Sequence, residues 1–310
     1  MKSWFKTLVA TCAVIPFAQC AMLPGGNVAR AAEPVAATAT TDADPALWVV
    51  KDEDTTIYLF GTVHVLKPGL SWFDETVKTA FDKSDQLMLE LVLPEDPAEM
   101  AKVMIPLAID QSGKTLPSRL SPDELKAYQA AMTSVGLPAA QFDMFEPWFP
   151  AMTLSILPLA KLGYDPEQGA EKQLTAKAKA AGKPIGGFET VEQQLGYFDS
   201  LPENSQVSFL NAVVRDLDKL GPQLDKMVVQ WAKGDPDALA VTMNESLAAT
   251  PDLAKVLLWD RNARWADQIK ARMDQPGTVF VAVGAGHLAG AKSVQDYLKE
   301  RGLVAERVEY

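Results

Sequence analysis

Cysteine is almost absent from the chain: only Cys12 and Cys20 occur among 310 residues. Both precede Ala31, after which we expect a signal peptide to be removed, so the predicted mature protein has no cysteine. This excludes disulfides, thiolate nucleophiles and closed thiolate zinc sites.

The first residues have the pattern of an export signal. Lys2 and Lys6 flank the start of an apolar stretch, residues 8–18, which is too short to span a bilayer. Cleavage after Ala31 or near Cys20 both fit, and lipidation of Cys20 is disfavoured by the residues before it. We therefore predict a signal peptide over residues 1–31 and a periplasmic or secreted protein.

Long apolar runs and positive charge are also lacking. No other apolar run reaches the ~20 residues of a spanning helix. The formal net charge is −11, and it becomes about −14 without residues 1–31, which carry three basic residues and no acidic one. We expect no nucleic-acid partner and no membrane span after signal cleavage. The oligomeric state stays open.

Histidine is as scarce as cysteine, and its two occurrences share one pattern. Both end an apolar strand-like run in Gly-x-x-His: IYLFGTVH, with Gly61 and His64, and VFVAVGAGH, with Gly284 and His287. Such runs are typical of buried parallel strands, whose carboxyl ends carry ligand sites in α/β folds. The pair predicts one site with both imidazoles on one rim, although each histidine alone is also compatible with a core or loop position.

A carboxylate lies inside another apolar run. Residues 86–92, QLMLELV, read as a buried strand that contains Glu90. A buried charge is costly unless it is paired or binds a metal. Glu90 is therefore the expected third member of the site, unless it points to solvent from a sheet edge.

The remaining pattern predicts an α/β domain. Residues 32–45 read as a disordered linker, and residues 46–310 as a single domain. Strands are expected at 47–51 and 56–60, joined as a hairpin, and a helix over 72–83 completes a βαβ unit with the strand at 86–92. A helical insertion is expected over about 94–160, and further helices over 205–273. A C-terminal half, with a helix at 291–301 and a strand at 303–308, repeats the order strand, Gly-x-x-His, helix, strand. The expected sheet is mainly parallel.

Three finer expectations concern residues after the second strand of the βαβ unit. The stretch 142–159, rich in Phe, Trp, Met and Pro, is either a lid or groove over the site or an irregular core helix pair. Glu189 follows a short strand at 184–188, where it either lines the same rim or favours a helix N-terminus. Arg261 and Asn262 lie on a later helix, capped by Thr250, and have the chemistry to orient a carboxylate or bind a carbonyl.

Two imidazoles and a carboxylate commonly hold a catalytic divalent metal and leave positions for water and substrate. Nitrogen and oxygen ligands suit Zn, Mn or Co, and also Ni or Fe. Glu90 is expected either as a ligand or as the base that activates the water. A metal-free site, with one histidine as general base and Glu90 orienting it, is a further alternative.

Other catalytic motifs are missing. The chain has no G-x-S-x-G elbow, no P-loop and no H-E-x-x-H helix. The run GAGHLA at 284–289 matches a dinucleotide fingerprint, but too little chain follows it for a complete binding domain.

At this point several segments resemble the TraB/PrgY/GumN family, and in particular its GumN-like bacterial members. The matching stretches are TTIYLFGTVHVL, LMLELV, GKPIGGFETVEQQL, RNARWADQI and TVFVAVGAGHLAG, in the family's order. The resemblance implies kinship with TIKI metal-dependent proteases and, more distantly, with EreA-like erythromycin esterases and ChaN-like proteins.

By position, the resemblance implies that His64, Glu90 and His287 are metal or catalytic residues, with Glu189, Arg261 and Asn262 in shared motifs. The function expected is an exported metal-dependent hydrolase that cleaves an amide or ester bond in a peptide or small molecule. The alternatives are a non-catalytic periplasmic binder of haem or a peptide, and a metal-free esterase-like enzyme.

Overall fold

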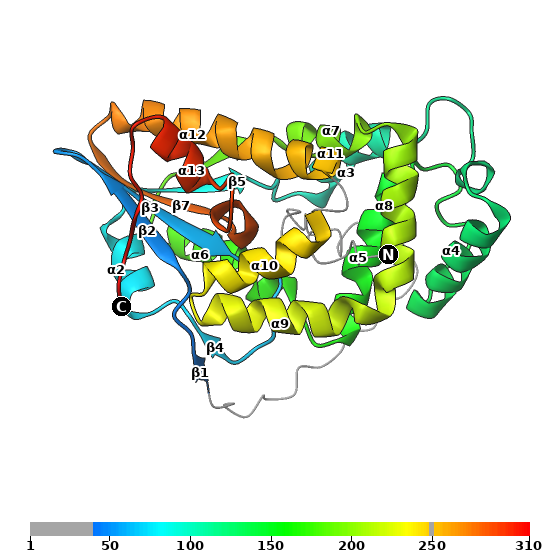
Figure 1. The fold of residues 1–310 in the computed structure, drawn as a ribbon, viewed down its shortest axis with the longest axis horizontal. Helices are drawn as coiled ribbons and strands as arrows, with labels where there is room; N and C mark the ends of the chain where they lie inside the picture. Colours follow the sequence, from blue (N-terminus) through cyan, green and yellow to red (C-terminus); the bar gives the residue numbers. More distant parts are fainter. Residues whose placement is uncertain (1–39, 248–250) are drawn as a thin grey trace.

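A mixed six-stranded sheet is the centre of the protein (Figure 1). The computed structural model describes residues 40–247 and 251–310. The strand order is β6-β5-β7-β3-β2-β8. The strands are β2 Leu47–Lys51, β3 Thr55–Thr62, β5 Gln86–Leu91, β6 Ile185–Glu189, β7 Gly277–Gly284 and β8 Glu306–Arg307. Two further strands, β1 Thr41–Asp42 and β4 Leu70–Ser71, pair with each other.

The register of β3 and β7 brings the two Gly-x-x-His motifs to one edge. The strands run parallel from Thr55 opposite Gly277 to Thr62 opposite Gly284. Strand β7 also pairs in parallel with β5. Because the carboxyl ends of parallel strands meet at one edge, His64, Glu90 and His287 share a rim.

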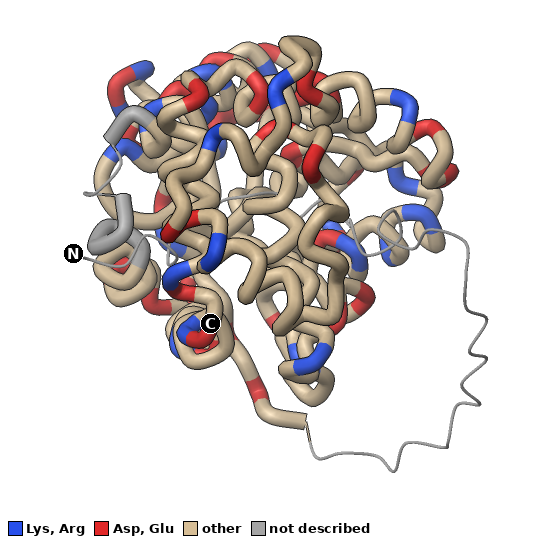
Figure 2. The backbone as a smooth tube through the Cα atoms, turned by 90° about the vertical axis from the view of Figure 1, so that its right-hand side faces the viewer, with Lys and Arg blue, Asp and Glu red and all other residues tan. Residues whose placement is uncertain are grey.

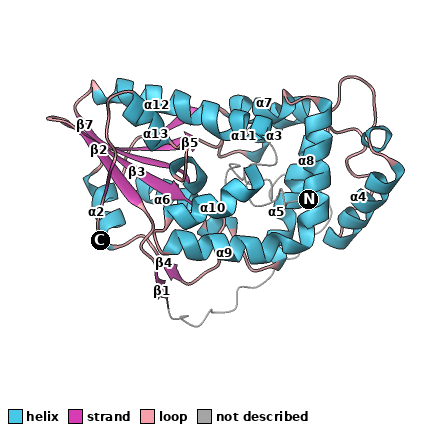
Figure 3. Ribbon diagram, viewed as in Figure 1, coloured by secondary structure: helices cyan, strands magenta, loops and turns pink. Residues whose placement is uncertain are grey.

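Helices cover both faces of the sheet, as buried apolar side chains on both faces require. One face packs against α12 Asp260–Met273 and α13 Val294–Glu300. The other packs against α2 Glu75–Lys83, α6 Ala170–Ala180 and α9 Leu220–Ala232. The sheet occupies one end of the molecule and the remaining helices the other (Figure 3).

The helical part has its own apolar core. It is built mainly from α3 Pro97–Ala108, α4 Pro122–Val135, α5 Trp148–Lys161, α7 Val191–Asp199 and α8 Glu203–Asp216. Helix α4 begins with the capping box predicted at Ser121 and Glu124. The remaining helices are α10 Pro236–Leu247 and α11 Pro251–Ala254, and a π-helical turn, Lys255–Trp259, precedes α12.

A buried ion pair joins two parts of the connection between α3 and α4. Arg119 contacts the carboxylate of Asp110, and both side chains are almost fully buried. Asp110 also accepts hydrogen bonds from the backbone N–H and the hydroxyl of Ser112. Burial opposes ionisation, but these donors and Arg119 outweigh it, so the pKa of Asp110 is lowered.

The predicted fold class is confirmed: an α/β protein with a mainly parallel sheet and a helical insertion. The hairpin of β2 and β3 is also confirmed. The stretch 142–159 contains buried core helix α5, in agreement with the second of its two interpretations.

Two details differ from the prediction, and a third, the order of the strands, was not predicted. The disordered linker is wrong for residues 40–45, where β1 pairs with β4 and Ala43 is buried. Strand β8 spans two residues rather than six and pairs with β2. Strand β7 lies between β3 and β5 of the N-terminal βαβ unit. The predicted signal peptide, the linker before residue 40 and the Thr250 cap lie outside the described residues.

Candidate functional site

Three elements at the carboxyl edge of the sheet carry the predicted site residues. His64 follows β3, Glu90 lies near the end of β5, and His287 lies in the 3-10 turn Ala285–Leu288 after β7. Glu90 is 3% exposed and His287 is fully buried. The His64 side chain is 11% exposed, so the site lies almost entirely below the surface.

Arg261 of α12 is the hub of the buried contacts. Its Nε and Nη2 donate to Glu189, at 2.8 to 3.1 Å, and Nη2 also donates to Glu90 at 2.7 Å. Its Nη1 donates to the carbonyl of Leu257, at 3.2 Å, and lies 3.3 Å from His287 Nε2. A guanidinium has five N–H groups, so every donor of Arg261 is used inside the protein. Burial opposes its charge, but Glu90 and Glu189 outweigh burial and raise the pKa of Arg261.

Glu90 is held as a carboxylate. One oxygen accepts the N–H of Gly284 at 2.7 Å, and the other accepts from Arg261 and from Gln194. Burial would raise the pKa of Glu90, but Arg261, His287, His64 and the Gly284 amide together lower it to about 2. The first glycine of the second motif therefore supplies a backbone donor to the predicted carboxylate.

His64 is oriented by a residue that the sequence did not single out. Its Nδ1 lies 2.7 Å from Oε1 of Glu171, on the first turn of α6, and Thr62 contacts the same oxygen. Its Nε2 is buried and has no hydrogen-bond partner among the described residues. Burial disfavours the imidazolium, but Glu171 outweighs burial and the pKa of His64 is raised.

His287 has a different environment from His64. Its Nδ1 lies 2.5 Å from Oδ1 of Asn262, and its Nε2 lies 3.6 Å from Glu90. The ring packs on Trp265 with centroids 4.3 Å apart. The Asn262 amide and Arg261 therefore lie nearest to this imidazole, with the Glu90 carboxylate slightly farther away, whereas the Glu171 carboxylate contacts His64 directly.

Glu189 belongs to the same buried network. Besides Arg261, it accepts hydrogen bonds from Trp265, Tyr197 and Gln194, at 3.1 to 3.2 Å. Its position directly before Thr190, the cap of α7, also matches the helix-terminus interpretation. Gln194 bridges Glu189 and Glu90.

Two glycines allow close approach around the first motif. A Cβ on Gly61 would lie 3.0 Å from the Cα of Ala285, so the end of β3 packs against the second motif. A Cβ on Gly169 would lie 2.0 Å from the carbonyl oxygen of His64. Gly169 caps α6, and its small size lets this helix place Glu171 beside His64.

The metal predicted at His64, Glu90 and His287 requires three ligands that converge. The described residues contain no group of three or more His, Cys, Asp or Glu side chains that could hold a metal ion. Arg261 bonds to Glu90 and lies against His287 Nε2, so in these positions the three side chains do not form a metal site. The site nevertheless holds three carboxyl groups, those of Glu90, Glu171 and Glu189, and one guanidinium, that of Arg261.

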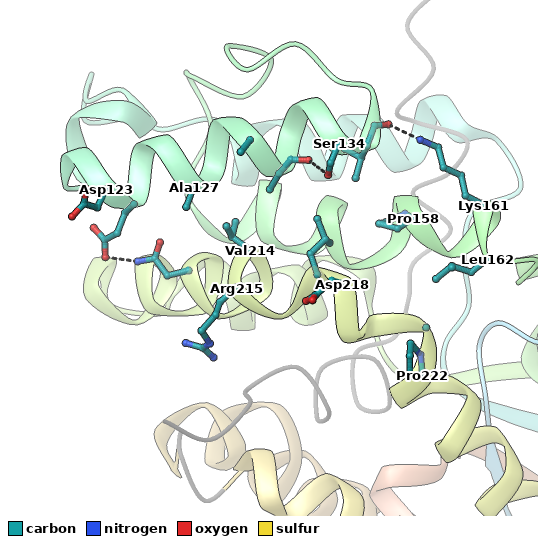
Figure 4. A pocket seen from close by; sticks show the side chains of 17 residues that line it. Asp123, Ala127, Ser134, Pro158, Lys161, Leu162, Val214, Arg215, Asp218 and Pro222 are labelled. Carbon is teal, nitrogen blue, oxygen red and sulfur yellow. Dashed lines mark hydrogen bonds between the residues drawn. The ribbon is translucent and has the colours of Figure 1, made fainter.

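A large cavity of about 930 Å³ lies elsewhere, between α4, the end of α5 and α8 (Figure 4). Asn211 and Glu124 bridge its walls at one end, and Lys161 reaches the Val135 carbonyl at the other. None of the predicted site residues lines it. Lys and Arg are interspersed with Asp and Glu over the face seen in Figure 2. Over the part of the chain that the structure describes, no helix has the length and apolar character to cross a membrane.

Comparison with known proteins identifies relatives over most of the chain. An uncharacterized Escherichia coli protein, YbaP, is 25% identical over 255 residues, which cover 82% of this chain and 92% of YbaP. An uncharacterized Treponema pallidum protein is 24% identical, over 94% of this chain and 89% of that protein. The zebrafish metalloprotease TIKI1 is 23% identical, over 87% of this chain and 64% of its own length. No solved structure matches the chain.

The TraB/PrgY/gumN family model matches residues 46–307. This range includes all the strands of the central sheet and every predicted site residue. The chain belongs to the TraB/PrgY/gumN family.

Proposed function

We propose that this protein is a hydrolase that cleaves an amide or ester bond, with His64 as the base that activates water. The observation that carries the proposal is the difference between the two ring nitrogens of His64. Nδ1 is held by Glu171, and Nε2 is buried without a hydrogen-bond partner among the described residues. An imidazole oriented in this way can accept a proton from a water molecule at Nε2.

Each residue has a defined part in this reaction. Glu171 keeps the Nδ1 proton of His64 in place and stabilises the imidazolium once Nε2 has taken the proton. His64 then returns that proton to the leaving group. Glu90 and Glu189 hold Arg261, whose donors are all used within the protein and which therefore supplies positive charge to the site without binding substrate directly.

The relative named a metalloprotease supports peptides as the substrate class. Export, proposed from the signal-peptide pattern of residues 1–31, would expose the site to peptides outside the cytoplasm. The divalent metal ion predicted from the sequence is retained as a separate proposal. The excess of carboxyl groups over cations in the site supports it, although no reaction step here depends on it.

A substrate screen with three variants tests the function. Purified protein is incubated with a peptide library and a panel of esters, and products are identified by mass spectrometry. We expect cleavage that His64→Ala abolishes and that Glu167→Gln, an exposed change on the turn before α6, leaves unchanged. Absence of cleavage in both substrate classes would favour the binding alternative.

The metal is tested on the same preparation. One divalent ion per chain in elemental analysis, lost in the His64→Ala, His287→Ala double variant, would support the metal-dependent reaction. Cleavage that persists in a chelator, with no bound ion, would support the histidine base acting alone.

A further inference from the structure

The cavity between α4, α5 and α8 is separate from the candidate site and has a mainly apolar lining. Its volume of about 930 Å³ lies within the ~300–1,000 Å³ of typical ligand sites. Alanines of α4 form one wall, Val214 and Leu217 line the opposite wall, and Pro158 and Leu162 line one end (Figure 4). Leu162 is 43% exposed, so a large apolar side chain is open to solvent here. An apolar partner surface would cover it.

Each long wall of the cavity is one face of a helix. The lining residues recur at intervals of three or four, which is the spacing of a helical face. From Ala127 to Ser134 the lined face of α4 covers about two turns, roughly 10 Å. The residues of the two faces are Ala127, Ala130, Ala131 and Ser134 on α4, and Asn211, Val214, Arg215 and Asp218 on α8 and the 3-10 turn after it, Leu217–Lys219.

Two helical walls with a trough between them have the geometry that binds an amphipathic helix. The side chains on the α4 wall are small, and helices pack at ~8–10 Å according to the side chains at the contact. A third helix can therefore approach α4 closely, as in a helical bundle.

Three charged side chains of the lining lack a strong partner within the part of the chain that the structure describes. Asp123 lies at one end of the cavity, and Asp218 lies between the ends (Figure 4). Neither carboxylate forms a salt bridge or accepts a hydrogen bond from another described residue. Lys161 lies at the other end, where its Nζ is 3.5 Å from the carbonyl oxygen of Val135. Two carboxylates and one ammonium are therefore open to a ligand.

The other charged lining residues already have partners. Glu124 accepts hydrogen bonds from the backbone N–H of Ser121 and from Asn211, at 2.8 and 2.6 Å. Arg215 pairs with Asp216 at 2.9 Å. The open charges of the cavity are thus negative on balance, and the net charge of the chain, −11, also attracts a cationic partner.

We propose that this cavity binds an amphipathic helix of a partner protein, with an apolar face that is bordered by basic residues. The ends of the cavity specify the direction of the helix. The positive end of a helix dipole is its N-terminus, so this end lies near Asp123 and the C-terminus lies near Lys161. The proposal does not depend on the hydrolase function, because no residue of the proposed reaction lines the cavity.

A synthetic peptide tests the proposal. The probe has 14 residues, the length of α4, with leucines on one face, lysines on both sides of that face and a crosslink on the polar face that keeps it helical. One control peptide has the leucines in scrambled order, and the other has glutamate in place of lysine. Fluorescence anisotropy with the full chain should show saturable binding of the probe and at least tenfold weaker binding of both controls. Absence of binding, or equal binding of the three peptides, would overturn the proposal.

A substitution that fills the cavity tests its location. Ala130→Trp adds a large side chain to the exposed α4 wall, and we expect at least a tenfold loss of affinity for the probe. Ala271→Trp, at another exposed helical alanine on α12, is the matched control and should leave binding unchanged. Unchanged affinity in folded Ala130→Trp protein would show that the peptide binds elsewhere.

The charges are tested without added bulk. Asp123→Asn combined with Asp218→Asn should weaken binding of the probe about three- to tenfold, as expected for two exposed ion pairs. Glu53→Gln combined with Glu300→Gln makes the same change in net charge at exposed positions outside the cavity. Equal effects of the two double variants would refute charge complementarity, and this comparison decides the matter even where Ala130→Trp does not fold.

Two further measurements separate other occupants and the opposite orientation. Sedimentation of the wild type tests for a second copy, and a dimer that Ala130→Trp dissociates would overturn the proposal. Tighter binding of laurate than of the probe would assign the cavity to a small amphiphile instead. A nitroxide on the N-terminus of the probe should broaden amide signals near Asp123 more than those near Lys161, and the reverse pattern would refute the proposed direction.

Discussion

Gly169 lies directly against the backbone carbonyl of His64, where a Cβ would be 2.0 Å from the oxygen. Its φ of −58° is open to any residue, so space rather than backbone conformation requires glycine here. We predict that Gly169→Ala displaces α6 from the end of β3 and destabilises the protein by about 1–3 kcal/mol, as overpacked cores do. Urea unfolding measures this change.

The matched control for this substitution is Gly196 on α7, where an added Cβ meets nothing within 4 Å. Gly196→Ala should be neutral or stabilise by up to about 1 kcal/mol. Equal effects at the two glycines would contradict the close approach of α6 to His64.

Because Arg261 pairs with two buried carboxylates, we predict that its removal lowers the free energy of unfolding strongly. Arg261→Met leaves Glu90 and Glu189 buried without their cation, and we expect a loss of about 3–5 kcal/mol in the free energy of unfolding. Arg264→Met, three residues along the same helix and about half exposed, should cost about 1 kcal/mol or less. Denaturant unfolding of both variants makes the comparison. A similar cost for the two would refute the hub role of Arg261.

The contact between Glu171 and His64 predicts that a substitution at Glu171 lowers kcat without altering the fold. Glu171→Gln keeps the size of the side chain but loses the carboxylate that orients and stabilises the His64 ring. We expect kcat to fall roughly 100-fold, with KM little changed, by analogy with other groups that orient a reacting histidine. Steady-state kinetics on the substrate found in the screen, with Glu167→Gln as the control, measures the effect. Unchanged kcat would remove Glu171 from the reaction.

The lowered pKa of Asp110 predicts how the free energy of unfolding depends on pH. Because its pKa is lowered in the folded protein, its ionised form contributes stability above its unfolded value of about 3.9. This contribution is lost as the pH falls through the lower folded value. At pH 7 we expect Asp110→Asn to cost about 2 kcal/mol, and the wild type and this variant should converge below pH 3.9.

Unfolding free energies from pH 7 down to about pH 3 measure this convergence. Asp123→Asn, an exposed change on α4, should run parallel to the wild type across the series. A constant difference between Asp110→Asn and the wild type over the same range would argue against the Asp110–Arg119 pair as its source.

The sequence predicted those parts of the site that local patterns encode. Apolar runs that end in Gly-x-x-His placed His64 and His287 at strand ends, and a carboxylate inside an apolar strand marked Glu90 as a buried, paired group. Arg261 and Asn262 required the family resemblance, because on an isolated helix they look like surface residues. Their roles in a reaction remain predictions.

Other features depend on contacts between distant segments. Glu171 was missed because its place beside His64 depends on how α6 docks, and a helix N-terminal glutamate is ordinary by itself. The position of β7 between β3 and β5 was not predictable either, since no local signal specifies which parallel strands become neighbours. A pairing between the hub Arg261 and Glu90, 171 residues apart, has the same difficulty.

The position of β7 also determines when the central sheet can be completed during synthesis. Strand β7 begins at Gly277 and lies between β3 and β5, both made within the first third of translation. Until the ribosome has released almost the whole polypeptide, the two early strands have no partner between them, and His64 and Glu90 cannot meet His287. Assembly of this buried cluster is therefore among the final events in the biogenesis of the protein.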